Sequence, residues 1–259
     1  MLEITPVPAF EDNYIWLLRK PGAAAVAVVD PGDEDPVLEV LRAQGLDLAA
    51  ILLTHKHGDH TGGVEGLKQA FPDLPVYGPA HEPIRVVTHP LKEGDLLTLP
   101  FLDVEFTVME VPGHTEGHIA YYTEGVLFCG DTLFAAGCGR VFSGTHQQLH
   151  HSLQRFAQLP GDTKVYCAHE YTQANIGFAR WVEPDNPDVL ARAETIAQLR
   201  AQGRSTVPSL LELELKTNPF LRTWVAGVIA AAEKYSGKKH LDGAGVFTAI
   251  RTWKDKEYD

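Results

Sequence analysis

The stretch Thr54-His55-Lys56-His57-Gly58-Asp59-His60-Thr61-Gly62-Gly63 decides the fold and the chemistry predicted for this chain of 259 residues. It directly follows the apolar run 49–53, which is typical of a buried β-strand. In an extended segment His55 and His57 point to the same side, so they can bind one metal ion together. Gly58 is predicted to take a positive φ in a sharp turn, after which Asp59 and His60 face a second ion. This spacing favours a two-metal site.

Three further potential ligands follow other predicted strands. His114 comes after the β-prone run 106–111, Asp131 after the run 126–129, and His169 after the run 164–168. Open α/β sheets place their ligand sites beyond the carboxyl ends of the strands, so these side chains are expected to converge with the first group. A chance run of histidines in a surface loop is the alternative, but it does not explain why four strands end in ligand-type residues.

Composition and charge limit the partners of this protein. Lys and Arg number 22 and Asp and Glu 34, which gives a net charge of −12. Such an acidic chain argues against nucleic acid or an anionic membrane as the general partner, and an anionic substrate would need a local basic patch. The N-terminus lacks the pattern of a signal peptide, and no apolar stretch is long enough to span a bilayer.

The three cysteines are Cys129, Cys138 and Cys167, and they form no C-x-x-C pair. We expect buried free thiols rather than metal ligands or nucleophiles. Free thiols fit a reducing compartment, so we expect a cytoplasmic protein, and we take a monomer as the working expectation.

The order of expected elements is strand, helix, strand in the first part of the chain. Strands are expected at 10–18 and 24–29, and a helix capped by Asp35 is expected to end at Gly45. Hairpins are predicted between residues 91 and 128, followed by a helix over 145–159.

Helical periodicity replaces the strand signals in the last third of the chain. No strand is expected beyond His169, the last long helix is expected to end at Ser236-Gly237, and the tail 246–259 is mixed and charged. We therefore predict two domains, 1–172 and 173–259.

Several motifs resemble the metallo-β-lactamase superfamily. They are the run 54–63, Pro112-Gly113-His114-Thr115, Gly130-Asp131-Thr132 and Ala168-His169-Glu170. Others resemble the hydroxyacylglutathione hydrolases, also called glyoxalase II: Pro8-Ala9-Phe10-Glu11-Asp12-Asn13-Tyr14, Gly137-Cys138-Gly139-Arg140, His169-Glu170-Tyr171-Thr172, Val207-Pro208-Ser209 and Asn218-Pro219-Phe220-Leu221-Arg222. The resemblance extends from residue 6 to about residue 256.

This resemblance implies an α/β fold in which an αββα sandwich, residues 1–172, is the catalytic domain and a smaller all-helical domain, 173–259, binds glutathione. It also implies hydrolysis of S-(2-hydroxyacyl)glutathione thioesters such as S-lactoylglutathione to glutathione and the hydroxy acid. That reaction is the second step of methylglyoxal detoxification.

The resemblance further implies two divalent metal ions. One would be bound by His55, His57 and His114, the other by Asp59, His60 and His169, with Asp131 bridging both. This ligand set suits zinc, which we expect, and also iron or manganese. Two ions about 3.5 to 4 Å apart lower the pKa of a shared water towards about 7, and the resulting bridging hydroxide attacks the thioester carbonyl. Asp59 and Asp131 are the side chains assigned to catalysis.

The residues implied to bind glutathione are Arg140, Tyr171, Arg251 and Lys254. Arg251 and Lys254 are three residues apart, so one helical turn would place them side by side. The chain departs from the family at Phe142, where relatives often have a tyrosine, so one hydroxyl contact to glutathione would be missing. His118 is expected to support the ligand loop without binding metal.

Three other functions remain open from sequence. A persulfide dioxygenase of the same superfamily would use one iron held by two histidines and a carboxylate. A non-catalytic metal-binding relative is disfavoured because every ligand position is filled. A dinuclear hydrolase for a lactone or a phosphodiester is also possible, because a fold does not fix the substrate.

Overall fold

The computed structural model describes residues 2–258, and these residues form two compact units. Unit 1 comprises Met1–Glu110 and Thr115–Gly130, and unit 2 comprises Val111–His114 and Asp131–Asp259. Each unit therefore contains more than one stretch of the sequence. The predicted division at residue 172, into a catalytic part and a glutathione-binding part, stays a prediction.

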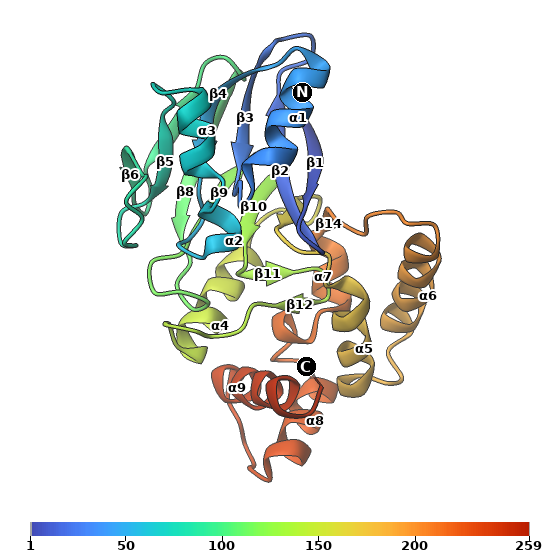
Figure 1. Cartoon of the computed structure of the whole chain (residues 1–259). Coiled ribbons are helices and arrows are strands. Elements are labelled where there is room, and N and C mark those ends of the chain that lie inside the picture. The colour runs from blue at the N-terminus through green and yellow to red at the C-terminus, as the bar shows by residue number, and fades with distance from the viewer. Residues whose placement is uncertain (1, 259) are drawn as a thin grey trace. The chain divides into compact units, whose positions relative to one another are not determined.

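Unit 1 contains a six-stranded sheet in the order of the sequence (Figure 1). Its strands are β1 (Glu3–Ala9), β2 (Asn13–Arg19), β3 (Ala25–Val29), β4 (Asp47–Leu52), β5 (Val76–Pro79) and β6 (His89–Leu91). Strands β1 to β3 are antiparallel, and β3 to β6 are parallel. The predicted strand 10–18 is wrong at its start, because Phe10 lies in the turn between β1 and β2 with φ 52°. We missed β1 because Pro6 and Pro8 argue against a strand, but β1 is at the sheet edge, where proline is tolerated.

Both faces of this sheet are buried. Val26 and Val28 pack into a core with residues of α1 (Glu34–Gln44) and α3 (Val64–Ala70), while Ala27 and Val29, which point the opposite way, are equally buried. Helix α1 ends at Gly45 with φ 62°, as predicted, but its N-cap is Asp33 and not Asp35. Strands buried on both faces explain the continuous apolar runs in the sequence.

The second half of unit 1 is an antiparallel series of strands, which confirms the predicted hairpins. They are β7 (Leu96–Leu99), β8 (Val104–Glu110), β9 (Ile119–Thr123) and β10 (Val126–Gly130). The buried hydroxyl of Tyr121 on β9 donates to the carbonyl of Leu53 at 2.8 Å. This bond ties the second set of strands to the start of the histidine-rich loop.

Unit 2 is mainly helical (Figure 1). Its elements are β11 (Leu133–Phe134), β12 (Gly137–Cys138), α4 (His146–Phe156), β13 (Lys164–Cys167), α5 (Thr172–Val182), α6 (Pro187–Ala201), β14 (Ser209–Leu210), α7 (Leu211–Thr217), η1 (Pro219–Leu221), α8 (Ala226–Ser236), α9 (Gly243–Trp253) and η2 (Lys254–Tyr258). Helix α4 begins just after its cap Thr145, at the predicted place, but ends at Phe156, three residues before the predicted end. Gly237, with φ 70°, ends α8, as predicted.

Two expectations for the last third of the chain are wrong. Ser209 and Leu210 form β14, which pairs with β13, so strand structure does occur beyond His169. The helix that ends at Gly237 is not the last one, because α9 covers Gly243–Trp253 and buries Val246, Phe247 and Ile250. The glycines in its first turn and a short buried face obscured its helical pattern.

The three cysteines are free and buried, as predicted. Burial raises the pKa of the Cys138 thiol to about 11 and that of Cys167 to about 12. Both therefore remain protonated thiols and inert packing groups. Among residues 2–258 no helix combines the length and the apolar character needed to cross a membrane.

Candidate metal centre

The histidine-rich loop of unit 1 connects β4 to the short helix α2 (Gly58–Thr61). His55 Nε2 lies 3.1 Å from His57 Nδ1, so the two rings do point to the same side. The expected positive φ at Gly58 is wrong, because Gly58 is the first residue of α2. The change in direction comes instead from the start of the helix, whose first turn carries Asp59 and His60.

Asp30, directly after β3, holds this loop in place through hydrogen bonds of its carboxylate. Its buried carboxylate accepts the Thr54 backbone N–H at 2.8 Å and the Thr54 hydroxyl at 2.7 Å, and it lies 3.0 Å from His60 Nδ1. Since the Thr54 hydroxyl proton is used on Asp30, its oxygen accepts from His55 Nδ1 at 3.1 Å. Both histidines thus carry their proton on Nδ1, which leaves Nε2 for a metal ion. Asp30 was not among our predicted residues.

Other side chains of unit 1 brace the same loop. Asn13 Nδ2 donates to Asp59 Oδ2 at 3.1 Å. The buried carboxylate of Glu82 accepts the backbone N–H groups of Lys56 at 2.9 Å and Gly117 at 3.0 Å. The buried ring of His118 stacks on His55 with centroids 4.6 Å apart. Together with Asp30, these three side chains hold the loop in one conformation.

Three predicted ligands lie in unit 2, where they surround one carboxylate. Asp131 Oδ2 lies 3.5 Å from His114 Nε2, and Asp131 Oδ1 lies 3.4 Å from His169 Nε2. His114 donates from Nδ1 to the Arg140 carbonyl at 2.8 Å, so its Nε2 is the atom available for a metal ion. A Cβ at Gly139 would lie 2.0 Å from the Asp131 carbonyl oxygen, so no side chain fits beside this group.

The ligand atoms form two groups, and within each group they lie within 4.8 Å of one another. One group contains His55, His57, His114 and Asp131, and the other contains Asp59, His60 and His169. Imidazole nitrogens and carboxylate oxygens at this spacing suit zinc, iron or manganese. The residues therefore fit two divalent metal ions by the chemistry of their donor atoms.

Tyr171, Phe142 and Arg140 lie beside the ligands of unit 2. The Tyr171 ring stacks on His169 with centroids 4.6 Å apart. The exposed ring of Phe142 lies edge-on to His114 at 5.2 Å. The Arg140 side chain is 52% exposed and its Nε lies 3.7 Å from Asp255 Oδ1, so it is accessible to a substrate.

Arg251 and Lys254 are buried, unlike Arg140. The guanidinium of Arg251 donates to the Cys138 carbonyl at 3.1 Å and to Asp255 at 2.8 Å, and it lies over the Phe220 ring. Lys254 Nζ lies 5.7 Å from the centroid of the Tyr258 ring. Both have partners within unit 2, so the contact of each with glutathione stays a prediction.

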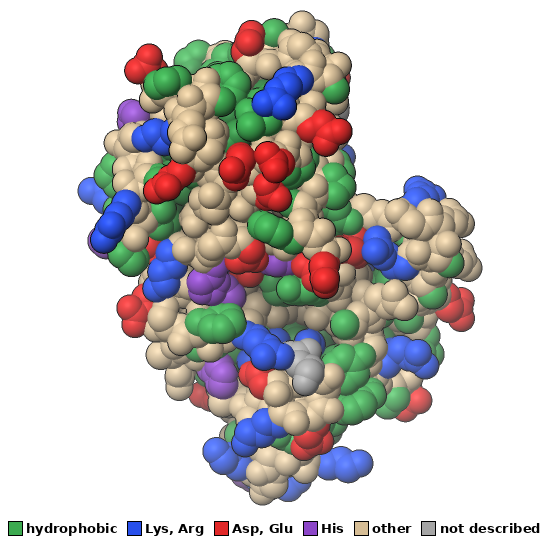
Figure 2. Space-filling model, in the orientation of Figure 1, with side chains coloured by type: hydrophobic (Ala, Val, Ile, Leu, Met, Phe, Trp, Pro, Cys, Tyr) green, Lys and Arg blue, Asp and Glu red, His purple; other side chains and the backbone are tan. Residues whose placement is uncertain are grey.

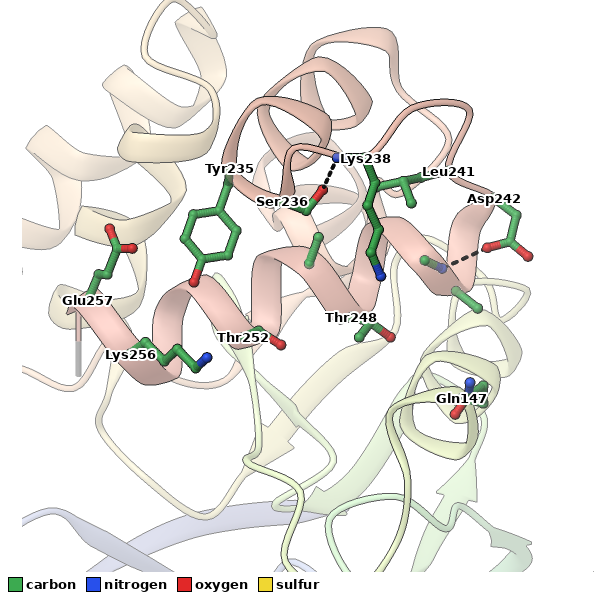
Figure 3. Close-up of a pocket in the computed structure, with 13 residues that line it drawn as sticks. Gln147, Tyr235, Ser236, Lys238, Leu241, Asp242, Thr248, Thr252, Lys256 and Glu257 are labelled. Atoms are coloured by element: carbon green, nitrogen blue, oxygen red, sulfur yellow. Dashed lines mark hydrogen bonds between the residues drawn. The ribbon is translucent and has the colours of Figure 1, made fainter.

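A pocket of about 850 Å³ lies in unit 2 along the face of α9 that carries Thr248 and Thr252, continuing to Lys256 (Figure 3). The helical repeat places Arg251 and Lys254 away from this face. Lys238 also lines the pocket, and Figure 2 shows Lys and Arg side chains gathered over the same end of unit 2. Among the described residues that line it, none is a predicted ligand or glutathione-binding residue.

Comparison with known families gives two matches along the chain. Residues 9–169 match the family described as "Metallo-beta-lactamase superfamily". Residues 170–257 match "Hydroxyacylglutathione hydrolase C-terminus". Together the two matches extend over nearly the whole sequence.

Curated relatives match the full length of the chain. "Hydroxyacylglutathione hydrolase" of Pseudomonas fluorescens (strain SBW25) is 53% identical over 99% of this chain and 100% of its own length. The protein of the same name from Methylobacillus flagellatus is 53% identical over 98% of this chain and 99% of its own. Among solved structures, "TTHA1623 in a di-iron-bound form" is 31% identical, with a TM-score of 0.51 over 64% of this chain and 91% of that chain.

Proposed function

This chain belongs to the hydroxyacylglutathione hydrolase family of the metallo-β-lactamase superfamily, and we propose on that premise that it hydrolyses S-(2-hydroxyacyl)glutathione thioesters such as S-lactoylglutathione. The family confirms the predicted fold class, a metallo-β-lactamase fold followed by a helical segment. The observation that best supports this substrate is the sequence identity of about 50% to relatives of this name, which extends over the C-terminal helical segment as well as the N-terminal part of the chain. The products would be glutathione and a 2-hydroxy acid.

The metal centre proposed for this reaction is dinuclear. His55, His57 and His114 would hold one ion, Asp59, His60 and His169 would hold the other, and Asp131, which lies close to both His114 and His169, would contribute to both. Zinc is our proposal, with iron or manganese as alternatives, since the donor set suits all three. When bound, two such ions would supply a metal-activated hydroxide at neutral pH and Lewis-acid polarisation of the thioester carbonyl.

The protein's own contribution is orientation. Asp30, acting directly on His60 and through Thr54 on His55, fixes the ring tautomers that expose Nε2. The Arg140 carbonyl does the same for His114. Asn13 fixes the carboxylate of Asp59, whose Oδ2 lies 3.4 Å from His60 Nε2. Ligands held in advance by hydrogen bonds need no reorganisation during the reaction.

Glutathione recognition is proposed to use Arg140, Tyr171, Arg251 and Lys254. Arg140 is the accessible cation of this set, so it is the residue we expect to pair with a glutathione carboxylate. Tyr171 presents a ring that is 38% exposed beside His169. Arg251 and Lys254 are buried, and their direct contact with glutathione remains part of this proposal.

Three further proposals concern the roles of the two segments, the compartment and the oligomeric state. The segment 173–259 is proposed to bind glutathione and 1–172 to carry the catalytic chemistry. Free buried thiols favour a reducing cytoplasm, and a monomer remains our expectation. The match of residues 170–257 to the hydroxyacylglutathione hydrolase C-terminus favours this function over the iron dioxygenase and over another metallo-hydrolase.

Steady-state hydrolysis by the purified protein tests the proposed substrate. S-lactoylglutathione should be cleaved, and a β-lactam and a lactone should be cleaved far more slowly. Elemental analysis should find close to two metal ions per chain. Preferential hydrolysis of the lactone, or full activity with one ion after metal loading, would overturn the assignment.

A further inference from the structure

The hairpin β11–β12 in unit 2 is an unusual connection because its backbone is buried. Leu133 pairs with Cys138 and Phe134 with Gly137, and Ala136 in the turn has φ 58°. All of residues 133–138 are buried. The carbonyl and N–H groups of a buried turn cannot bond to water, so the protein must supply their partners.

Four helical elements supply these partners as side chains. Asn175 on α5 donates to the Ala135 carbonyl at 3.2 Å, and Glu214 on α7 accepts the Ala136 N–H at 2.8 Å. Asn218, which caps η1, donates to the Gly137 carbonyl at 2.9 Å and lies 3.3 Å from that of Phe134. Arg251 on α9 donates to the Cys138 carbonyl at 3.1 Å. We call these four residues, Asn175, Glu214, Asn218 and Arg251, the hairpin clamp.

The clamp is itself rigid. Glu214 is fully buried, and its carboxylate also accepts from Arg192, Ser209 and Asn218. A charge-assisted network whose members are all hydrogen-bonded holds its geometry strongly. The approach is also close, because a Cβ at Gly137 would lie 2.5 Å from the Asn175 side chain. The helices therefore fix the hairpin with little freedom.

One proposed ligand and the backbone support of another adjoin the two ends of the hairpin. Asp131 lies two residues before Leu133, the first residue of the hairpin. Arg140, whose carbonyl sets the His114 tautomer, lies two residues after Cys138, the last residue of the hairpin. The Phe134 ring also lies edge-on to His169 at 5.7 Å. Any shift of the hairpin would move the carboxylate and both imidazoles that surround it.

We propose that the hairpin clamp consists of positioning residues that set the metal-binding geometry of Asp131 and His114. The helical segment then has a second role beside glutathione binding, since α5, α7, η1 and α9 shape the metal centre through the backbone of one hairpin. This inference rests on the proposed metal ligands. It predicts that weakening one clamp residue loosens the metal ions without touching any ligand.

The test compares two asparagines with matched local roles. Asn218 and Asn186 each cap a following helix with Oδ1, and each donates from Nδ2 to a backbone carbonyl. Only Asn218 contacts the hairpin. The rate at which full-length protein loaded with Co²⁺ releases metal to a chromophoric chelator should rise about tenfold in Asn218→Ala, and its Co²⁺ absorption bands should change. Asn186→Ala should match the wild type in both.

The outcomes separate this inference from the proposed function. If the wild type binds two ions and hydrolyses the thioester, but Asn218→Ala releases metal no faster than Asn186→Ala, the clamp has no positioning role. If the wild type binds no metal, the proposed function fails first. Should Asn218→Ala not fold, Asn175→Ala removes a single clamp contact without removing a cap, and it should also release Co²⁺ faster than the control. Unchanged release there would equally reject the clamp.

Discussion

The proposed ligands of unit 1 and those of unit 2 are supported in different ways. In unit 1 the proposed ligands lie within six residues, and the Asp30 side chain at the end of β3 bonds directly to His60 and, through the Thr54 hydroxyl, to His55. In unit 2 the ligands are spread from His114 to His169, and much of their support is backbone: the Arg140 carbonyl and the buried hairpin. Ligands within one short loop are thus supported by neighbouring strands, whereas ligands spread along the chain depend on helices that are distant in sequence.

Replacing Asp131 by Ala should have the largest effect. It removes the carboxylate that lies 3.5 Å from His114 Nε2 and 3.4 Å from His169 Nε2. Metal affinity should fall by more than the roughly 100-fold that loss of an outer partner can cost, and thioester hydrolysis should fall with it. Metal content and kcat measured on the same preparation check this.

Lys56→Ala is the control for that variant, since Lys56 lies between two ligands but is not one of them. Metal content should stay at the wild-type level. Equal losses from the two substitutions would show that the loss in Asp131→Ala reflects general damage to the protein and not removal of a ligand.

The second prediction concerns the support in unit 1. The same Asp30 oxygen accepts from the Thr54 hydroxyl and from His60 Nδ1. Asp30→Asn puts an NH₂ group in its place, and an NH₂ group accepts neither hydrogen bond. His60 then loses the bond that fixes its tautomer, and metal affinity should fall about 10- to 100-fold. Asp33→Asn is the matched control, because it removes the same charge while asparagine still caps α1. Competition with a chelator measures both, and equal affinities would reject the role of Asp30.

The sequence pointed to the proposed ligands because they lie just beyond predicted strands, but it pointed to few of the side chains that support them. Asp30 also follows a strand, yet one acidic residue before Pro31-Gly32 is typical of any turn. The clamp was harder to find, since Glu214 lies 78 residues from Ala136 and Asn218 lies 81 residues from Gly137. Contacts at that separation depend on tertiary packing, which no local pattern contains. The same reason explains why the sequence did not show that Arg251 is buried.

The third prediction separates substrate binding from metal binding in unit 2. Arg140→Ala removes an accessible cation but leaves the Arg140 carbonyl in place for His114. KM for S-lactoylglutathione should rise roughly fivefold at low salt, equivalent to about 1 kcal/mol, with kcat and metal content nearly unchanged. The effect should shrink as salt is added, because salt screens exposed charges. A fall in kcat with KM unchanged would place Arg140 among the residues that support the metal.

The smallest expected effect is that of pH on stability, and it should originate in unit 2. His146 and His150 on α4 lie half-buried against Phe247 of α9, with ring centroids 6.1 and 5.7 Å away. Burial lowers the pKa of both below 6.5, helped by Arg251 for His146 and by His151 for His150, and opposed by Asp255 and Asp242.

The sign follows from linkage. A histidine whose pKa is lower in the folded state is protonated first in the unfolded chain, so its contribution to stability is complete above about pH 6.5 and is lost as the pH falls below that value. Urea unfolding between about pH 8 and pH 5.5 should show a smaller loss of unfolding free energy in His146→Gln/His150→Gln than in the wild type. Hydrogen exchange should show α4 and α9 losing protection in this range before β3 and β4 of unit 1. An identical pH dependence in wild type and double variant would assign the titration to other groups, and earlier loss in unit 1 would reverse the proposed difference between the two regions.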